Sequence, residues 1–191
     1  MFERLLRSIA EKVSSTEEEL QICTSYFTPK KLRKRQYLLQ EGDVCNRLAF
    51  VEKGALYSYS IDAKGVQHVI QFAFEGWWIA DLYSFFTREP SKLNIEALDE
   101  SELLLLDREQ HQKLLREVPG YETYTRILYQ NAYVALQQRI EGTLGLSADE
   151  KYARLLEQYP SILNRVPLHL IASYLGVTPE TLSRIRKQMT R

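Results

Sequence analysis

The sequence predicts an α+β protein in which a body of short antiparallel strands is followed by a long helix and a C-terminal helix-turn-helix. Three observations support this fold class. Turn signals containing glycine recur every 11 or 12 residues between Gly42 and Gly76. A proline-free stretch of helical character runs roughly from Tyr121 to Leu144. Residues 168–187 have the spacing of two short helices around a tight corner.

The N-terminal part of the chain changes from helical to strand-like patterning. Residues 1–28 are expected to be helical, and strands are expected from Lys34 to Asp107. Two capping boxes are possible in the helical part: Ser15 with Glu18, or Thr16 with Glu19. Between the glycine turns, apolar residues alternate with a period of two, as in half-buried strands. These residues are Leu48 and Phe50, then Tyr57, Tyr59 and Ile61, then Ile70, Phe72 and Phe74. The last strand, Leu103–Leu106, is apolar at every position and is expected to be buried on both faces.

Two helices are expected after the strands. Asp107 is the expected N-cap of a short helix, with Gln110 as capping-box partner, and Pro119-Gly120 ends it. In the long helix that follows, alternating spacings of three and four place a set of residues on one seam, and we expect this seam to face a second subunit. The seam comprises Tyr124, Ile127, Asn131, Val134 and Gln138, whereas Leu128, Leu136 and Ile140 lie off it and are expected to pack on the strands. A helix buried on one side only is the alternative interpretation.

The C-terminal domain begins with a clear helix start. Ser147 and Glu150 form a capping box for a helix from Ala148 to Gln158, which Pro160 stops. The helix-turn-helix follows, with Gly176 at the corner, where a left-handed backbone is least costly for glycine. Its interhelical contacts are expected from Ile171, Ala172, Leu175, Val177, Leu182 and Ile185.

The second helix of this corner has its own start signal. Thr178 is the expected N-cap, Pro179 takes the first helical position, and Glu180 lies in the first turn. Such a helix can enter the DNA major groove, although an ordinary helical hairpin has the same spacing. Charge favours the DNA-binding interpretation. Residues 164–191 hold five basic residues and one acidic residue, whereas residues 1–163 hold 20 basic and 24 acidic residues.

Composition excludes several classes of protein. The chain is 45% hydrophobic and 26% charged, with no apolar run of membrane-spanning length, and its N-terminus does not resemble a secretory signal. Two cysteines, Cys23 and Cys45, are too few for a disulfide framework, so a reducing cytoplasm is expected. No metal site, cofactor or catalytic residue is expected. The histidines His68, His111 and His169 fall in separate elements, and no phosphate loop or nucleophile motif occurs.

Three stretches carry a resemblance to a known family: Leu39–Asp43, Val51–Gly54 and Ile171–Arg184. Together with the order of elements, they resemble the Crp/Fnr family of bacterial transcription factors. The resemblance implies a cyclic nucleotide-binding-like β-roll at residues 1–118 with N-terminal helices. It also implies a dimerisation helix at 119–145 and a helix-turn-helix domain at 146–191. Because the chain stops at Arg191, a C-terminal wing is expected to be lacking.

The resemblance also gives a candidate effector pocket. Relatives that bind cyclic nucleotides hold the ribose with Gly-Glu and the phosphate with an arginine, whereas this chain has Ala80-Asp81 and Ser91 at those positions. A phosphodiester would therefore lose its main charge-assisted contact, and cAMP is not the expected effector. The candidate pocket residues are Trp78, Ala80, Asp81, Ser91 and Lys92. Either another small molecule binds there, or the aromatic residues of this region are plain core.

The expected function is sequence-specific DNA binding by a dimer that regulates transcription at a palindromic site. Its partners are double-stranded DNA, a second copy of the chain and RNA polymerase, with no membrane. Arg184 is the expected base reader, because its guanidinium matches guanine O6 and N7. The full set of expected DNA contacts is Thr178, Pro179, Glu180, Ser183, Arg184, Arg186 and Lys187. The alternative is a small-molecule sensor or protein-interaction module of the same fold that does not bind DNA.

Overall fold

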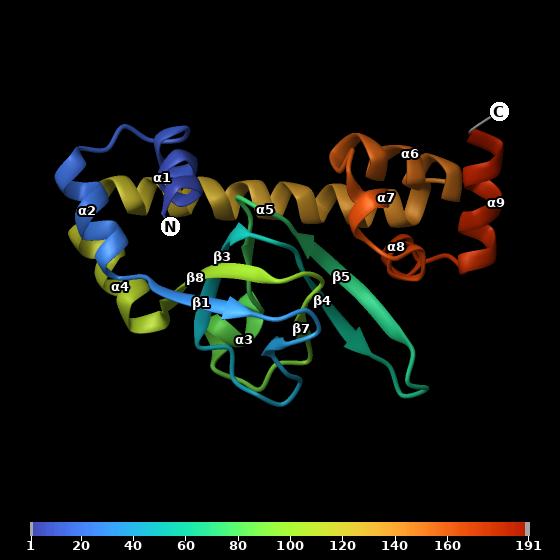
Figure 1. The fold of residues 1–191 in the computed structure, drawn as a ribbon, viewed down its shortest axis with the longest axis horizontal. Coiled ribbons are helices and arrows are strands. Elements are labelled where there is room, and N and C mark those ends of the chain that lie inside the picture. Colours follow the sequence, from blue (N-terminus) through green and yellow to red (C-terminus); the bar gives the residue numbers. More distant parts are fainter. Residues whose placement is uncertain (1, 190–191) are drawn as a thin grey trace. The chain divides into compact units, whose positions relative to one another are not determined.

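The computed structural model describes residues 2–189, which fold as two compact units. The first unit comprises residues 2–60 and 71–130, and the second comprises residues 61–70 and 131–189. Figure 1 shows the helices and strands, coloured from the N-terminus to the C-terminus. The predicted α+β class with antiparallel strands is confirmed.

The strands form a roll of two four-stranded antiparallel sheets. One sheet has the order β1-β8-β3-β6 and the other the order β2-β7-β4-β5. Their bounds are β1 Thr28–Leu32, β2 Tyr37–Leu39, β3 Arg47–Lys53, β4 Leu56–Ile61, β5 Gln67–Ala73, β6 Trp78–Ile79, β7 Asn94–Ala97 and β8 Ser101–Asp107. The expected strand region starts too late, because β1 begins at Thr28. This edge strand is exposed at four of its five positions and therefore lacks an apolar alternation.

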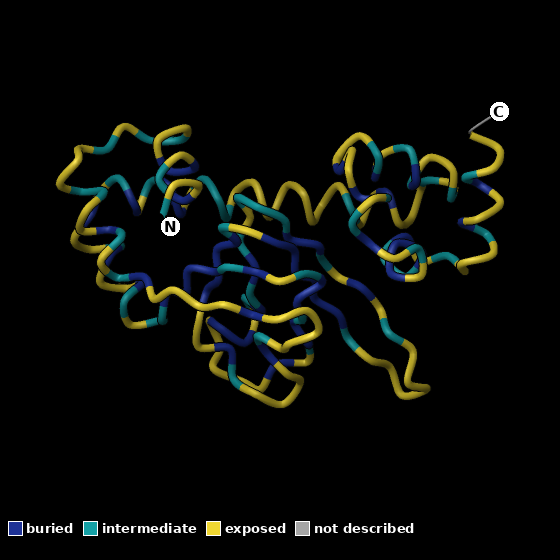
Figure 2. The backbone as a smooth tube through the Cα atoms, viewed as in Figure 1, coloured by how far each residue is buried: buried dark blue, intermediate teal, exposed yellow. Residues whose placement is uncertain are grey.

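Strand β8 is buried on both faces, as its sequence predicts. Leu103 and Leu105 belong to the core between the two sheets, whereas Leu104 and Leu106 pack with the helices of the first unit. Figure 2 shows buried residues concentrated in these central strands. The continuous leucine run is therefore required by two separate cores on either side of one strand.

The predicted turns are found at the four glycines of the roll, all with positive φ. Gly54 is the most constrained of them, because an added Cβ would lie 2.3 Å from Ser101 Oγ and 2.6 Å from the carbonyl oxygen of Glu100. Gly42 has a similar φ of 92°, yet nothing lies within 4 Å of its Cβ position. Space and conformation both require glycine at position 54, whereas only conformation does at position 42.

The first unit also contains helices that pack against the roll. Their bounds are α1 Glu3–Ala10, α2 Glu17–Ser25, α3 Leu82–Thr87 and α4 Arg108–Glu117. The long helix α5, Pro119–Gly145, begins in this unit and continues in the second unit from residue 131. Of the two possible capping boxes before α2, the structure contains Thr16 with Glu19. The capping box expected at Asp107 is wrong. Asp107 is the N-cap residue of α4, but its side chain makes no cap hydrogen bond and instead accepts from Arg47 Nε at 2.7 Å.

Helix α5 begins at Pro119, which also separates it from α4 as expected. The predicted seam is wrong at Tyr124, which is fully buried and accepts a hydrogen bond from Trp78 Nε1 at 3.0 Å. Leu128 packs on the first unit as expected. Leu136 and Ile140 do not pack on the strands, since they are 56% and 53% exposed. The apolar side of α5 therefore changes direction along the helix.

The second unit contains the remaining helices. Their bounds are α6 Ala148–Gln158, α7 Ile162–Arg165, α8 Leu168–Leu175 and α9 Pro179–Met189. The capping box of α6 is present as predicted: the Ser147 hydroxyl accepts from the amide of Glu150, and the Glu150 carboxylate accepts from the amide of Ser147. Both ends of α6 coincide with the sequence prediction.

Candidate nucleic-acid interface

Helices α8 and α9 form the predicted helix-turn-helix. Helix α8 ends at Gly176, whose φ of 69° and ψ of 33° are left-handed. The amide of Val177 then donates to the carbonyl of Ala172 at 3.0 Å and closes the corner. Thr178 caps α9, because its hydroxyl accepts from the amide of Thr181 at 3.2 Å. Pro179 takes the first helical position, where a missing N–H costs nothing.

The inner side of the corner is closely packed. Ile171, Ala172 and Leu182 are fully buried, and Leu175 and Ile185 are nearly so. Val177 is half-buried. Because residues 182 and 185 point into this core, the residues between and beside them are placed on the outer surface of α9.

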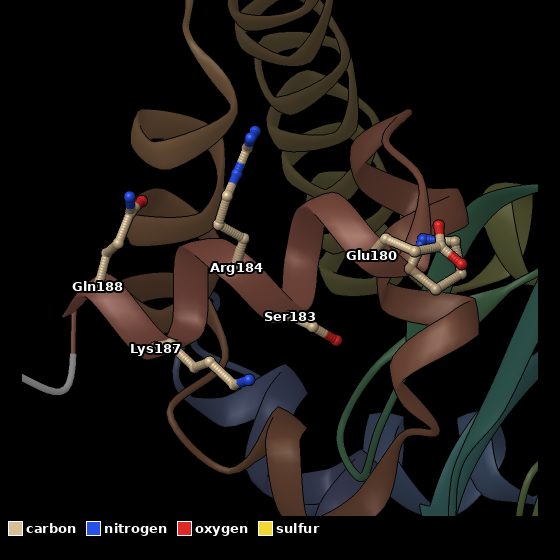
Figure 3. A pocket seen from close by; sticks show the side chains of 6 residues that line it. Glu180, Ser183, Arg184, Lys187 and Gln188 are labelled. Carbon is tan, nitrogen blue, oxygen red and sulfur yellow. The ribbon is translucent and has the colours of Figure 1, made fainter.

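The outer face of α9 lines an open groove of about 600 Å³. Its lining residues are Pro179, Glu180, Ser183, Arg184, Lys187 and Gln188. Figure 3 shows Arg184 and Gln188 extending on one side of the helix, and Ser183 and Lys187 on another. Five of these six residues are expected DNA contacts. Gln188 was not predicted, although it follows Arg184 by four residues and therefore lies on the same face.

Glu180 is directed to the start of its own helix. Its own backbone amide and the Thr178 hydroxyl lower the pKa of the Glu180 carboxyl by hydrogen bonding, so the side chain is anionic at neutral pH. Among the described residues, no ion pair joins Glu180 to Arg184. The Arg184 guanidinium is exposed and is left available for an external acceptor.

The remaining expected DNA contacts lie beside the groove. Thr178 is exposed at the N-cap, and Arg186 is half-buried in the last turns of α9. Their positions at the start and end of the helix are suited to DNA backbone contact rather than to base contact.

The candidate effector residues lie in the first unit. Asp81 is buried at the start of α3, where its carboxylate accepts from the amide of Ser84 at 3.2 Å. Its other oxygen accepts from the hydroxyl of Ser91 at 2.7 Å, and Ser91 is also buried. Lys92, the next residue, is exposed. The two positions at which relatives hold a nucleotide therefore bond to each other in this chain.

The two other candidates near this site have structural contacts. Trp78 is half-buried and packs edge-on against Phe50, with 5.3 Å between the ring centroids. Ala80 is half-buried and packs against the core of the roll. Both therefore take part in the packing of the roll, as the core interpretation of this region implies.

Within residues 2–189, no group of three or more His, Cys, Asp or Glu side chains converges as a metal site. Both cysteines are buried free thiols. No helix in this part of the chain is long and apolar enough to cross a membrane.

Known proteins share this fold. Residues 29–118 match the family model of the cyclic nucleotide-binding domain. The roll, the long helix and the helix-turn-helix together are the fold of the Crp/Fnr transcription regulators, so the resemblance predicted from the sequence is confirmed. Among curated protein sequences, none matches this chain significantly.

Solved structures cover nearly the whole chain. The regulator CLP of Xanthomonas campestris, described as responsive to c-di-GMP, is 13% identical, with 92% of each chain covered and a TM-score of 0.73. FixK2 of Bradyrhizobium japonicum is 20% identical, with 86% of this chain and 84% of FixK2 covered and a TM-score of 0.72. A structure described as a putative transcriptional regulator of the Crp/Fnr family from Eubacterium rectale is 18% identical and has a TM-score of 0.67. The match covers 92% of this chain and 84% of that chain.

Proposed function

We propose that this chain is a cytoplasmic, dimeric transcription regulator that reads a palindromic DNA site with helix α9. The observation that carries the proposal is the outer face of α9, where Ser183, Arg184, Lys187 and Gln188 surround an open groove. The apolar side of the same helix is fixed in the helix-turn-helix core. A rigid helix with one free polar face is the arrangement that enters a major groove.

The side chains divide into base readers and phosphate contacts. Arg184 can donate two hydrogen bonds to guanine O6 and N7, and Gln188 can pair with adenine N6 and N7. Lys187 and Arg186 are suited to phosphates, as are the Thr178 hydroxyl and the amides at the start of α9. Because the Glu180 carboxylate is directed to that helix start, Glu180 would have to turn outward to accept from cytosine N4.

Dimerisation is supported by an exposed apolar stripe on α5. Its residues are Tyr133, Leu136, Ile140 and Leu144, with spacings of three, four and four, and each is more than half exposed. Such an exposed apolar stripe fits the same stripe of a second copy. Two recognition helices would then read two half-sites about 34 Å apart, which gives more affinity than one.

The effector, if one is needed, is proposed to be different from a cyclic nucleotide. Ser91 supplies no cation for a cyclic phosphate, and the Asp81 carboxylate is already hydrogen-bonded to Ser91 and to the amide of Ser84. Placing a phosphate there would bring two anions together without a guanidinium between them. A thermal shift assay with cAMP should therefore leave the melting temperature unchanged. A rise that saturates with ligand concentration would contradict this part of the proposal.

The second candidate function is a sensor or protein-interaction module of the same fold that does not bind DNA. The salt dependence of binding to random duplex separates the two. A regulator should bind at about 50 mM salt and lose affinity steeply as salt rises, because each phosphate contact releases counterions. A chain that ignores duplex DNA at low salt belongs to the second class. RNA polymerase is a proposed partner only for the first.

Selection of bound sites from random or genomic duplex fragments tests the function directly. We expect a consensus with two-fold symmetry whose half-sites are separated by about one helical turn. A consensus without symmetry would contradict the dimeric arrangement. Absence of any enriched sequence would contradict specific recognition by α9.

A further inference from the structure

The hairpin between β4 and β5 is built into the same unit as the helix-turn-helix. Its tip, residues 61–70, belongs to the second unit together with residues 131–189. The tip is internally ordered: Asp62 accepts from the amides of Lys64 and Val66 at 2.9 Å, and its other carboxylate oxygen lies 3.0 Å from His68 Nε2. Because these hydrogen bonds fix the turn, the hairpin is a rigid support for the residues that contact it.

The outer edge of β5 is occupied by a serine from the first helix of the corner. The hydroxyl of Ser173 on α8 donates to the carbonyl of Gln67 at 2.7 Å and accepts from the amide of Val69 at 3.0 Å. β5 is the terminal strand of its sheet within residues 2–189, so these backbone groups lie on the outer edge of the sheet. One side chain of α8 therefore takes the place of a strand partner.

An arginine of α5 donates hydrogen bonds to the next carbonyl groups of the same strand. Arg139 Nη2 donates to the carbonyl of Val69 at 3.1 Å, and Nη1 donates to the carbonyl of Ile70. The same guanidinium lies over the ring of Tyr174, 4.3 Å from its centroid, and Tyr174 follows Ser173 on α8. Arg139 thus contacts both the hairpin and α8, in a geometry that the forked guanidinium allows and a lysine does not.

We propose that Ser173 and Arg139 are positioning residues that fix the orientation of the recognition helix on α5. Together with residues 67–70 they form a clasp that ties α8, and through the packed corner α9, to the half of α5 that carries the apolar stripe. This inference rests on the proposed function, because the stripe is the proposed dimer contact. In a dimer the clasp would set the distance and angle between the two recognition helices, and hence the half-site spacing that the protein accepts.

The clasp also has a direct chain connection to the roll. Strand β5 runs from Gln67 in the second unit to Ala73 in the first, and β4 enters the hairpin at Ile61. A change in the register or twist of these strands would therefore change the groups that Ser173 and Arg139 bind. The backbone of β4 and β5 therefore connects the roll to the clasp, which is proposed to set the accepted half-site spacing.

The test compares Ser173→Ala with wild type on three duplexes: the selected palindrome, the palindrome lengthened by one base pair at its centre, and a single half-site. Loss of two hydrogen bonds predicts about tenfold weaker binding to the palindrome. It also predicts a smaller penalty for the added base pair and affinity within about twofold on the half-site. Arg139→Lys should act in the same direction, and Ser173→Thr, which retains a hydroxyl, should restore most of the affinity.

A matched control comes from the same unit. Ser161 is exposed and its side chain makes no cap hydrogen bond. Ser161→Ala should bind all three duplexes like wild type. The proposal is overturned if Ser173→Ala leaves palindrome affinity and the spacing penalty unchanged. It is also overturned if half-site affinity falls by the same factor, because positioning would then not be the cause.

A second readout does not depend on DNA. The amide of Val69 should exchange its hydrogen at least about tenfold faster in Ser173→Ala than in wild type, because its acceptor is removed. Equal exchange rates would show that the clasp is not formed in solution. A wild-type chain that binds no duplex would overturn the proposed function, and the Val69 rate would still decide whether the clasp exists.

Discussion

A buried histidine should make the first unit sensitive to mild acid. His111 on α4 is only 3% exposed, and its Nδ1 lies 2.9 Å from the hydroxyl of Tyr121. Burial lowers the pKa of His111 to about 4 from an ordinary value near 6.5. Since the unfolded chain binds the proton more tightly, the stability from neutral His111 is fully present above pH 6.5 and is lost as pH falls towards 4. The loss in unfolding free energy is about 2 kcal/mol between pH 7.5 and 5, and about 3 kcal/mol in full.

The assay is urea unfolding at several pH values, followed by tryptophan fluorescence. Both tryptophans, Trp77 and Trp78, lie in the first unit and report on it selectively. His111→Gln removes the titrating ring, so its unfolding free energy should fall about 2 kcal/mol less than that of wild type over this range. His169→Gln removes an exposed histidine of the second unit and should behave like wild type. Equal pH dependence in wild type and His111→Gln would refute the reasoning.

Three further predictions concern packing, capping and association. Gly54→Ala should lower the unfolding free energy of the first unit by about 2–4 kcal/mol, because the added Cβ meets Ser101 and the backbone at positive φ. Gly42→Ala, where the Cβ meets nothing, should lower it by about 1 kcal/mol. Equal losses would contradict the steric account. Thr16→Ala removes the capping box of α2 and should cost about 1 kcal/mol in the same fluorescence assay, and no loss would show that the cap is unimportant. Ile140→Glu should yield monomers in sedimentation, and dimers that survive it would place the interface elsewhere.

The C-terminal elements could be predicted from the sequence because their signals are local. The capping box of Ser147 and Glu150 defines the start of α6, and Pro160 defines its end. The corner at Gly176 and the cap at Thr178 are likewise set by residues within one turn of the positions they determine. Local rules therefore located the outer face of α9, apart from Gln188.

The elements that were predicted incorrectly depend on distant neighbours. Tyr124 has the spacing of a seam residue, but its hydroxyl is held by Ser8 and Trp78 within the first unit. Asp107 has the sequence of a side-chain cap, yet Arg47 on the adjacent strand takes its carboxylate. The hydrogen bonds of Ser173 and Arg139 to β5 also depend on distant partners, because they join residues about 105 and 70 positions apart along the chain. Periodicity alone contains no information about such partners.

The effector region was predictable in one respect only. The residue types at positions 80, 81 and 91 show that the usual nucleotide contacts are not present. That Ser91 donates to Asp81 follows from the three-dimensional path of two separate segments, the start of α3 and the loop before β7. The sequence could predict which ligand class is disfavoured, but it could not show what the remaining side chains do.

The central claim is that the outer face of α9 reads DNA bases. It is tested most directly by the affinity of Arg184→Ala for the selected palindrome and for a palindrome changed at the guanine that Arg184 is proposed to contact. We predict a loss of about 1–3 kcal/mol on the selected site and little remaining preference between the two duplexes. Lys187→Ala, as a phosphate-contact control, should weaken both equally and flatten the salt dependence. Unchanged affinity and preference in Arg184→Ala would contradict the account.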